Sequence, residues 1–285
     1  MRVACLLLLG FMPLFMFCQT TFQTDHREVH FYDTLEKYTY VIIGLEPIDN
    51  SHTRFKDAFG ASGFFIRHTN NRLFLVSAYH VFTGCPMYPN DSTYHPEYLK
   101  IWYPDTSDLY RFVLVPLTAY INKPCKTASE TADVEAMDVT TYFRKINIFS
   151  IEHMAPTFCQ NTPDTIEEEP VACYGLISDS TGKSLPKEGQ RRQPLTGYTS
   201  FFITIPVDSF DTPGKYYLTV RPAFKSGYSG APVFRIRSDS LHTKAIEFAG
   251  IQVSNSKDTS EKRSHSLVVK PTGLLQRLTM HTPPY

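Results

Sequence analysis

The residue types that carry acyl-transfer chemistry occur in this chain in the order His80, Asp133 and Ser229. A histidine has a pKa near neutrality, so it can take a proton from a hydroxyl group and return it later. A carboxylate beside the imidazole can orient it and stabilise its protonated form. Ser229 lies in the stretch KSGYSGAPVF, between Gly227 and Gly230 and directly before an apolar run. These types fit a serine nucleophile with its base and its acid.

Gly227 has a separate part in this interpretation. A serine nucleophile of this kind needs main-chain N–H groups directed at the oxyanion, from the nucleophile and from the residue two before it. Glycine tolerates the backbone angles that turn its N–H inward, so Gly227 and Ser229 are the predicted donors. The plainer interpretation is a glycine-rich turn before a buried strand. A turn explains the glycines, but not their occurrence after a histidine and an acidic residue in this order.

The acidic residue has two candidates. Asp133 stands just before the apolar positions Val134 and Ala136, and we take it as the predicted acid. Asp138 also precedes an apolar residue, Val139, and competes for the same role. The pattern of the residues leaves this choice open.

Many short strands must position these residues. Apolar and β-branched runs are broken by Gly, Pro, Asn and Asp without alternating helices, which predicts a sandwich or barrels rather than a parallel α/β sheet. Residues 64–66 and 73–77 flank turn-forming asparagines and predict a hairpin whose second strand ends at His80. One helix is predicted, Thr272–Thr279, with Thr272 as its N-cap. Further strands are predicted at 38–44, 99–103, 109–117, 171–176, 201–207, 216–220, 231–236, 246–253 and 266–269. Two loops are predicted, an acidic connection between the halves at 161–170 and a second loop at 179–196.

The N-terminus, MRVACLLLLGFMPLFMFC, has one arginine and then an uncharged apolar run, as a secretory signal peptide has. We therefore predict a signal peptide over residues 1–18 and an exported protein, with no membrane span, since Pro13 interrupts a run that is short for one. A lipid anchor at Cys18 is the alternative. Without the signal, four cysteines remain, and an exported chain can pair them as two disulfides in three ways. These are Cys85, Cys125, Cys159 and Cys173.

The overall composition excludes several classes of function. The formal net charge is zero and no long basic block occurs, so the sequence lacks the clustered positive charge that is typical of nucleic-acid-binding proteins. The chain has no CxxC or HExxH motif, and we predict no metal site. With 42% hydrophobic and 20% charged residues, the chain is typical of a globular protein.

At these motifs the sequence resembles the trypsin/chymotrypsin-like serine proteases, and the bacterial-type single-chain branch in particular. GASGFFI followed by LVSAYHVF is similar to the block around that family's catalytic histidine, and DVEAM is similar to its aspartate block. GYSGAPVF resembles its GxSGxP nucleophile block. The resemblance covers residues 36 to 279, roughly.

The resemblance implies two packed six-stranded antiparallel β-barrels with a short C-terminal helix. The peptidase domain would span 19–285, with a first barrel at about 36–160, a second at about 170–270 and the helix at about 272–279. It also implies a secreted serine endopeptidase that uses His80, Asp133 and Ser229, needs no cofactor and takes a protein or peptide as substrate. The alternative is an inactive member of the fold that binds peptides or proteins. The sequence leaves the oligomeric state and the natural substrate open.

Four positions depart from the family's pattern or bear on specificity. Tyr228 stands where digestive members have an aspartate that pairs with a newly freed N-terminus, so zymogen activation of that type is not expected. Tyr79 is bulky where a small residue is usual, and Glu135 places a charge at a position that is usually small or apolar. Ala223 stands at the expected pocket base, which implies a neutral pocket for small or apolar side chains.

Overall fold

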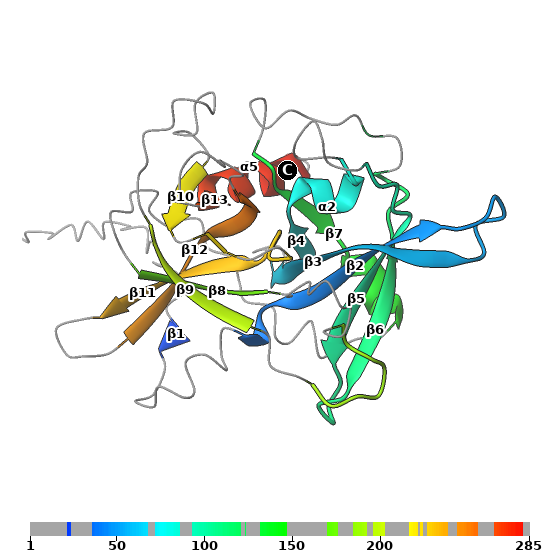
Figure 1. Ribbon diagram of the computed structural model, residues 1–285, viewed down its shortest axis with the longest axis horizontal. Coiled ribbons are helices and arrows are strands. Elements are labelled where there is room, and N and C mark those ends of the chain that lie inside the picture. The colour runs from blue at the N-terminus through cyan, green and yellow to red at the C-terminus, as the bar shows by residue number, and fades with distance from the viewer. Residues whose placement is uncertain are drawn as a thin grey trace, which may run out of the picture.

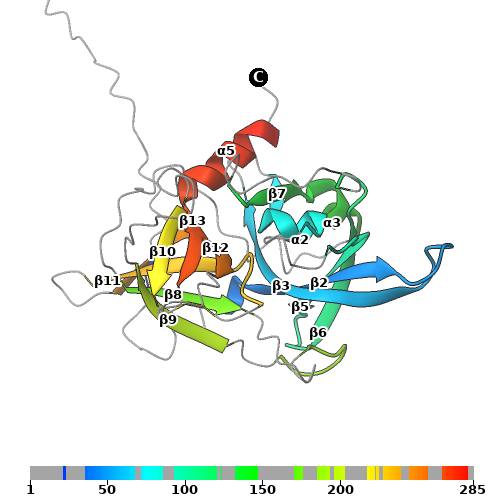
Figure 2. The ribbon, with the colours of Figure 1, turned by 45° about the horizontal axis from the view of Figure 1, so that its top comes forward.

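The computed structural model describes residues 22–23, 36–67, 72–85, 93–120, 123, 132–146, 170–175, 185–192, 196–202, 217–221, 223–224, 227–238, 244–255 and 265–281. Its strands form two antiparallel sheets that lie side by side, as Figure 1 shows. A helix at the C-terminal end lies over both sheets (Figure 2). The predicted fold class, two packed antiparallel β-barrels with a short C-terminal helix, is confirmed.

The first sheet carries the histidine and aspartate motifs. Its six strands follow the order β6-β5-β2-β3-β4-β7, all antiparallel. Their bounds are β2 Tyr40–Pro47, β3 Phe55–Arg67, β4 Leu73–Ser77, β5 Tyr98–Pro104, β6 Tyr110–Pro116 and β7 Glu135–Asp138.

The second sheet carries the serine motif. Its strands follow the order β1-β12-β11-β8-β9-β10-β13, and a further pairing of β12 with β13 closes the last six of them into a barrel. Their bounds are β1 Phe22–Gln23, β8 Pro170–Gly175, β9 Thr196–Phe202, β10 Tyr217–Arg221, β11 Pro232–Ser238, β12 Lys244–Asn255 and β13 Ser266–Val269.

Three helices differ from the expectation. The predicted strand ending at His80 stops at Ser77, and His80 lies in a short helix, α2 Tyr79–Thr83. A second helix, α3 Thr140–Ile146, was not predicted, because its aromatic and β-branched residues favour strands. The C-terminal helix α5 spans Pro271–His281, so Thr272 lies inside it and is not its N-cap. Proline suits the first helical position because the missing N–H would have no partner there.

Two strands also differ in extent. Strand β3 begins at Phe55, well before the predicted 64–66, and with β2 it forms a hairpin that projects beyond the sheet (Figure 1). Strand β9 begins at Thr196, where a loop was expected, and its predicted continuation to residue 207 lies outside the described residues. The other predicted strands occur within a few residues of their expected positions.

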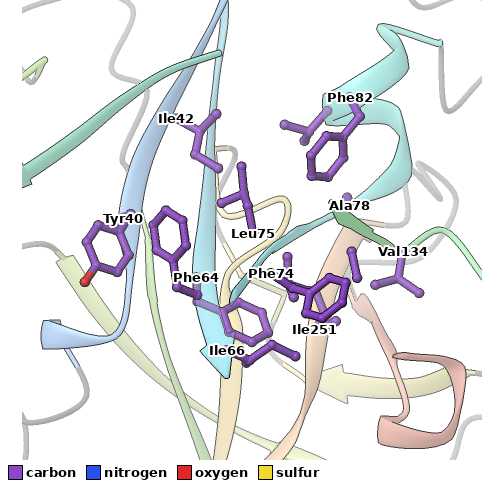
Figure 3. Packing of buried hydrophobic residues seen from close by; sticks show 14 of the residues in the cluster. Tyr40, Ile42, Phe64, Ile66, Phe74, Leu75, Ala78, Phe82, Val134 and Ile251 are labelled. Atoms are coloured by element: carbon purple, nitrogen blue, oxygen red, sulfur yellow. The ribbon is translucent and has the colours of Figure 1, made fainter. Parts of the chain in front are cut away.

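One apolar core joins the two sheets. Phe64, Phe74 and Val134 from the first sheet belong to the same buried cluster as Ile251 from the second, and Figure 3 shows Phe74 beside Ile251. Leu274 and Leu278 on α5 are fully buried in this cluster. The helix therefore packs on the seam between the sheets, where burying each leucine contributes about 1.5–3 kcal/mol.

The cysteines are only partly as expected. Cys85 is disulfide-bonded, whereas Cys173 is free and fully buried. Two disulfides among the four candidate cysteines would require Cys173, so that expectation is wrong. Cys125, Cys159 and the predicted signal peptide 1–18 lie outside the described residues. In the part of the chain that the structure describes, no helix has the length and apolar character to cross a membrane.

Candidate active site

The register of two neighbouring strands brings His80 and Asp133 together. Strands β4 and β7 are antiparallel, with Ser77 opposite Glu135. The chain leaves β4 after Ser77 and reaches His80 three residues later, while Asp133 lies two residues before Glu135. Both residues therefore lie at the same end of the strand pair.

Asp133 holds the histidine by two hydrogen bonds. Its Oδ2 lies 2.8 Å from His80 Nδ1, and its Oδ1 accepts the main-chain N–H of His80 at 3.1 Å. An ionised carboxylate only accepts, so Nδ1 must carry the hydrogen and Nε2 keeps a lone pair to accept a proton. The side chain of Asp133 is 6% exposed and that of His80 is 19% exposed, so the pair is largely shielded but the ring is reachable.

The competing aspartate, Asp138, has other partners. It lies opposite Phe74 on β4, at the end of the strand pair away from His80. Arg72 Nε donates to its Oδ2 at 2.8 Å, and the main-chain N–H of Thr140 donates to its Oδ1 at 2.9 Å. Burial acts to raise the pKa of Asp138, but the hydrogen bonds from Thr140 and Arg72 outweigh it and hold the pKa below its usual value.

A tyrosine from the second barrel contacts the same aspartate. The main-chain N–H of Asp133 donates to the hydroxyl of Tyr217, on β10, at 2.9 Å. Burial, aided by the negative charge of Asp133, raises the pKa of Tyr217 to about 12. The hydroxyl therefore stays neutral near pH 7 and links the two barrels at Asp133. Nothing in the sequence pattern around Tyr217 marks it for this contact.

Two of the unusual residues lie behind His80 and Asp133. Tyr79 and Glu135 are both buried, as is Arg277 on α5, whose guanidinium carbon lies 5.8 Å from the centre of the Tyr79 ring. Burial raises the pKa of Tyr79, the charges of Glu135 and Asp133 raise it further, and the charge of Arg277 opposes them. Charges from the first barrel and from α5 therefore meet at the Tyr79 ring.

Ser229 lies in a tight turn before β11. Gly227 and Gly230 on either side have positive φ values of 91° and 86°, which side chains other than glycine rarely adopt. Between them Tyr228 is fully buried and stacked on Phe224, with the ring centres 6.1 Å apart. The turn is thus held by apolar packing at the position where a charge would stand in the digestive members of the family that the sequence resembles.

This turn packs directly against the strands that lead to His80. The main-chain N–H of Ser62, on β3, donates to the Ser229 carbonyl at 2.8 Å. A Cβ on Gly230 would lie 1.9 Å from the Ser77 hydroxyl, so the turn touches the end of β4, three residues before His80. The serine motif and the His80–Asp133 pair therefore lie at the same junction of the two barrels.

The Ser229 hydroxyl itself points elsewhere. Its Oγ donates to the carbonyl of Val253, on β12, at 3.3 Å, and among the described residues no hydrogen bond joins it to His80. A rotation about the Cα–Cβ bond of Ser229 is needed before Nε2 can take its proton. Hydrogen bonds between catalytic groups are often loose or misaligned without substrate.

The main-chain N–H groups of Gly227 and Ser229 are the predicted oxyanion donors. Within the described residues, neither group donates to a hydrogen-bond acceptor. The carbonyl of Tyr228 accepts the N–H of Ala231 at 2.8 Å, so the N–H of Ser229, on the opposite side of the same peptide plane, points away from the turn's interior.

The pocket base that the resemblance implies is Ala223. Ala223 is half-buried, and the N–H of its neighbour Phe224 donates to the hydroxyl of Ser266 at 2.8 Å. Among the residues that the structure describes, no three His, Cys, Asp or Glu side chains form a group that could hold a metal ion. Sequence reasoning did not find Ser62, although it stands in the GASGFFI block that carried the resemblance.

Comparison with known proteins shows similarity at the level of the fold. No protein-family model matches the chain, and no curated protein sequence matches it. The crystal structure of the protease Anisep from Arthrobacter nicotinovorans aligns with a TM-score of 0.51, covering 87% of this chain and 96% of that chain at 11% sequence identity. The chain therefore has a protease-like all-β fold.

Proposed function

We propose that this chain is a serine endopeptidase. The observation that carries the proposal is the Asp133 carboxylate, which accepts both the Nδ1–H and the main-chain N–H of His80 and leaves Nε2 to act as a base. The Ser229 turn packs against the strand that leads to this histidine. The fold shared with a protease supports the same conclusion.

In the proposed reaction, Ser229 Oγ attacks the carbonyl carbon of the scissile peptide bond while His80 Nε2 takes its proton. Asp133 stabilises the imidazolium, and the N–H groups of Gly227 and Ser229 stabilise the tetrahedral oxyanion. The C–N bond then breaks as His80 gives its proton to the leaving amine, which leaves an acyl ester on Ser229. A water molecule, deprotonated by His80, hydrolyses this ester and releases the acid. These steps require neither a metal nor an organic cofactor.

The main test is Ser229→Ala together with a fluorophosphonate probe. We expect the unchanged chain to cleave a casein or peptide substrate and to be labelled at Ser229, and the variant to do neither. The turn should survive the change because, among the residues that the structure describes, the side chain of Ser229 makes one hydrogen bond, to Val253, worth about 1 kcal/mol. Peptide cleavage that persists in Ser229→Ala would overturn the proposal.

A binding module is the second candidate, and one observation favours it. The hydroxyl of Ser229 donates to the Val253 carbonyl rather than to His80, as expected of a serine that does not act as a nucleophile. A folded chain that binds peptides but is neither labelled nor able to cleave them would support this second function.

Export and specificity belong to the proposal as well. The apolar N-terminus supports secretion, and the mass of the mature protein would show whether residues 1–18 are removed or Cys18 carries a lipid. Ala223 supports a preference for small or apolar side chains before the scissile bond. Cleavage of a peptide library after arginine or lysine would exclude that preference.

A further inference from the structure

One residue of the first barrel holds both sides of the Ser229 turn. The Ser62 main-chain N–H donates to the Ser229 carbonyl at 2.8 Å, and the Ser62 hydroxyl donates to the Gly227 carbonyl at 3.0 Å. Ser62 is fully buried on β3. Because the Ser62 hydroxyl is buried, its hydrogen bond is only weakly screened by water and its loss is costly.

All three carbonyls of the turn, those of residues 227, 228 and 229, accept hydrogen bonds from within the protein. Ser62 donates hydrogen bonds to the carbonyls of Gly227 and Ser229. The main-chain N–H of Ala231 donates to the carbonyl of Tyr228 between them. Each peptide unit is planar, so a fixed carbonyl also fixes the direction of the N–H that follows it. The Gly227 carbonyl shares its peptide unit with the Tyr228 N–H, so the Ser62 hydroxyl fixes the peptide unit that lies between the two oxyanion donors, the N–H groups of Gly227 and Ser229. The oxyanion donors are thereby held in place before substrate binds.

Ser62 is itself held from the neighbouring strand. The hydroxyl of Ser77, on β4, donates to the Ser62 carbonyl at 2.8 Å. Gly230 fits against both serines, since a Cβ there would lie 1.9 Å from Ser77 Oγ and 2.2 Å from the Ser62 carbonyl oxygen. The turn has no room to move toward the first barrel.

From this geometry we propose that Ser62 is a positioning residue for the oxyanion site, which rests on the proposed peptidase function. Its hydroxyl fixes the peptide unit between Gly227 and Tyr228, and with it the relative placement of the two flanking N–H groups that would face the substrate oxygen. Tyr228 supports the same turn by burial and by stacking on Phe224, without a charge. The turn is thus formed by contacts within the folded chain, and no newly freed N-terminal amine is needed to form it.

The test is Ser62→Ala, which removes the hydroxyl contact and keeps the main-chain one. Losing a whole oxyanion donor costs about 10²–10³ in kcat, and misplacing a donor costs less, so we expect kcat to fall about 10- to 100-fold. KM for a short peptide amide should change less than threefold, because ground-state contacts are kept. Inhibition by a peptidyl boronate, whose oxygen occupies the oxyanion site, should weaken by the same factor as kcat. A purely structural role would lower the melting temperature without this split.

Two further variants make the test decisive. Ser77→Ala removes an equally buried hydroxyl that supports Ser62 only from behind and leaves the Gly227 contact, so its losses in kcat and boronate inhibition should be clearly smaller than those of Ser62→Ala. Ser62→Cys keeps nearly the same side-chain volume but has only a weak donor. If Ser62→Ala does not fold, this variant replaces it, and its kcat should fall by a similar factor. Wild-type kcat in the Ser62 variants, or equal losses in Ser77→Ala, would overturn the positioning role. An unchanged chain that neither cleaves nor labels would instead overturn the peptidase function itself.

Discussion

Gly230→Ala tests how the two barrels meet at the serine turn. Gly230 is buried with a φ of 86°, and its N–H donates to the Gln252 carbonyl at 2.7 Å. A new Cβ would lie 1.9 Å from the Ser77 hydroxyl and 2.2 Å from the Ser62 carbonyl oxygen. The hydroxyl can rotate away, but the carbonyl belongs to the backbone of β3 and must shift with its strand.

A second glycine supplies the matched control. Gly189 has a φ of 74°, but a Cβ there would meet nothing within 4 Å. Both substitutions incur the backbone cost of a positive φ, about 1–2 kcal/mol. Gly230→Ala adds overpacking of about 1–3 kcal/mol and disturbs hydrogen bonds worth about 1 kcal/mol. The free energy of unfolding should therefore fall about 2–4 kcal/mol more for Gly230→Ala than for Gly189→Ala.

Urea unfolding at neutral pH measures this difference, with thermal melting at one scan rate as a second measurement. For a chain of this size, we expect Gly230→Ala to melt roughly 5–10 °C below Gly189→Ala. The same shift should displace Ser229 and abolish peptide cleavage, while Gly189→Ala stays active. Equal losses of stability in both variants would show that Gly230 does not pack against Ser62 and Ser77 as described.

Three remaining predictions concern the two aspartates and the free thiol. Asp133→Asn should lower kcat about 10⁴-fold on a peptide ester, whereas Asp138→Asn should leave kcat unchanged; the reverse result would exchange their roles. Asp138→Asn should lower stability at pH 7, because hydrogen bonds that depress the folded-state pKa of Asp138 stabilise the fold above the unfolded pKa of about 4. This loss should vanish as the pH falls through the folded-state pKa, and a loss that persists at pH 2 would argue against it. Burial raises the pKa of the Cys173 thiol, so maleimide should label Cys173 only in denaturant, and fast labelling of the native chain would contradict its burial.

The strands could be predicted from the sequence more easily than the short helices. The periodicity of apolar residues located most strands of both barrels, because half-buried strands show it directly. The five-residue helix α2 has no such signal, since Val81 and Phe82 continue the apolar run of β4 into the same core. The projecting part of β3 was missed because Lys56 and Asp57 are exposed there and no alternation marks the strand.

Choosing between the aspartates required the register of β4 against β7. Both Asp133 and Asp138 precede apolar residues, and nothing local distinguishes them. Antiparallel pairing of Ser77 with Glu135 places Asp133 at the end of the pair where His80 follows, and leaves Asp138 at the other end, opposite Phe74. This is a long-range property, as are the contacts of Ser62 and Tyr217, which join strands from different barrels.

Tyr79 and Glu135, which depart from the pattern of the family that the sequence resembles, interact with each other and with Arg277. A carboxylate at Glu135, buried two residues from Asp133, would by itself place two negative charges behind His80, at a high cost in free energy. Arg277 brings a positive charge to the same place from α5, over the ring of Tyr79, and its charge opposes that of Glu135 at the Tyr79 hydroxyl. A smaller residue at position 79 would remove the ring that Arg277 covers, and the loss of Arg277 would leave the buried carboxylates without its positive charge. Tyr79 therefore interacts with the charges of Glu135, Arg277 and Asp133 alike, so the large tyrosine, the extra carboxylate and the C-terminal arginine are electrostatically linked beside the His80–Asp133 pair.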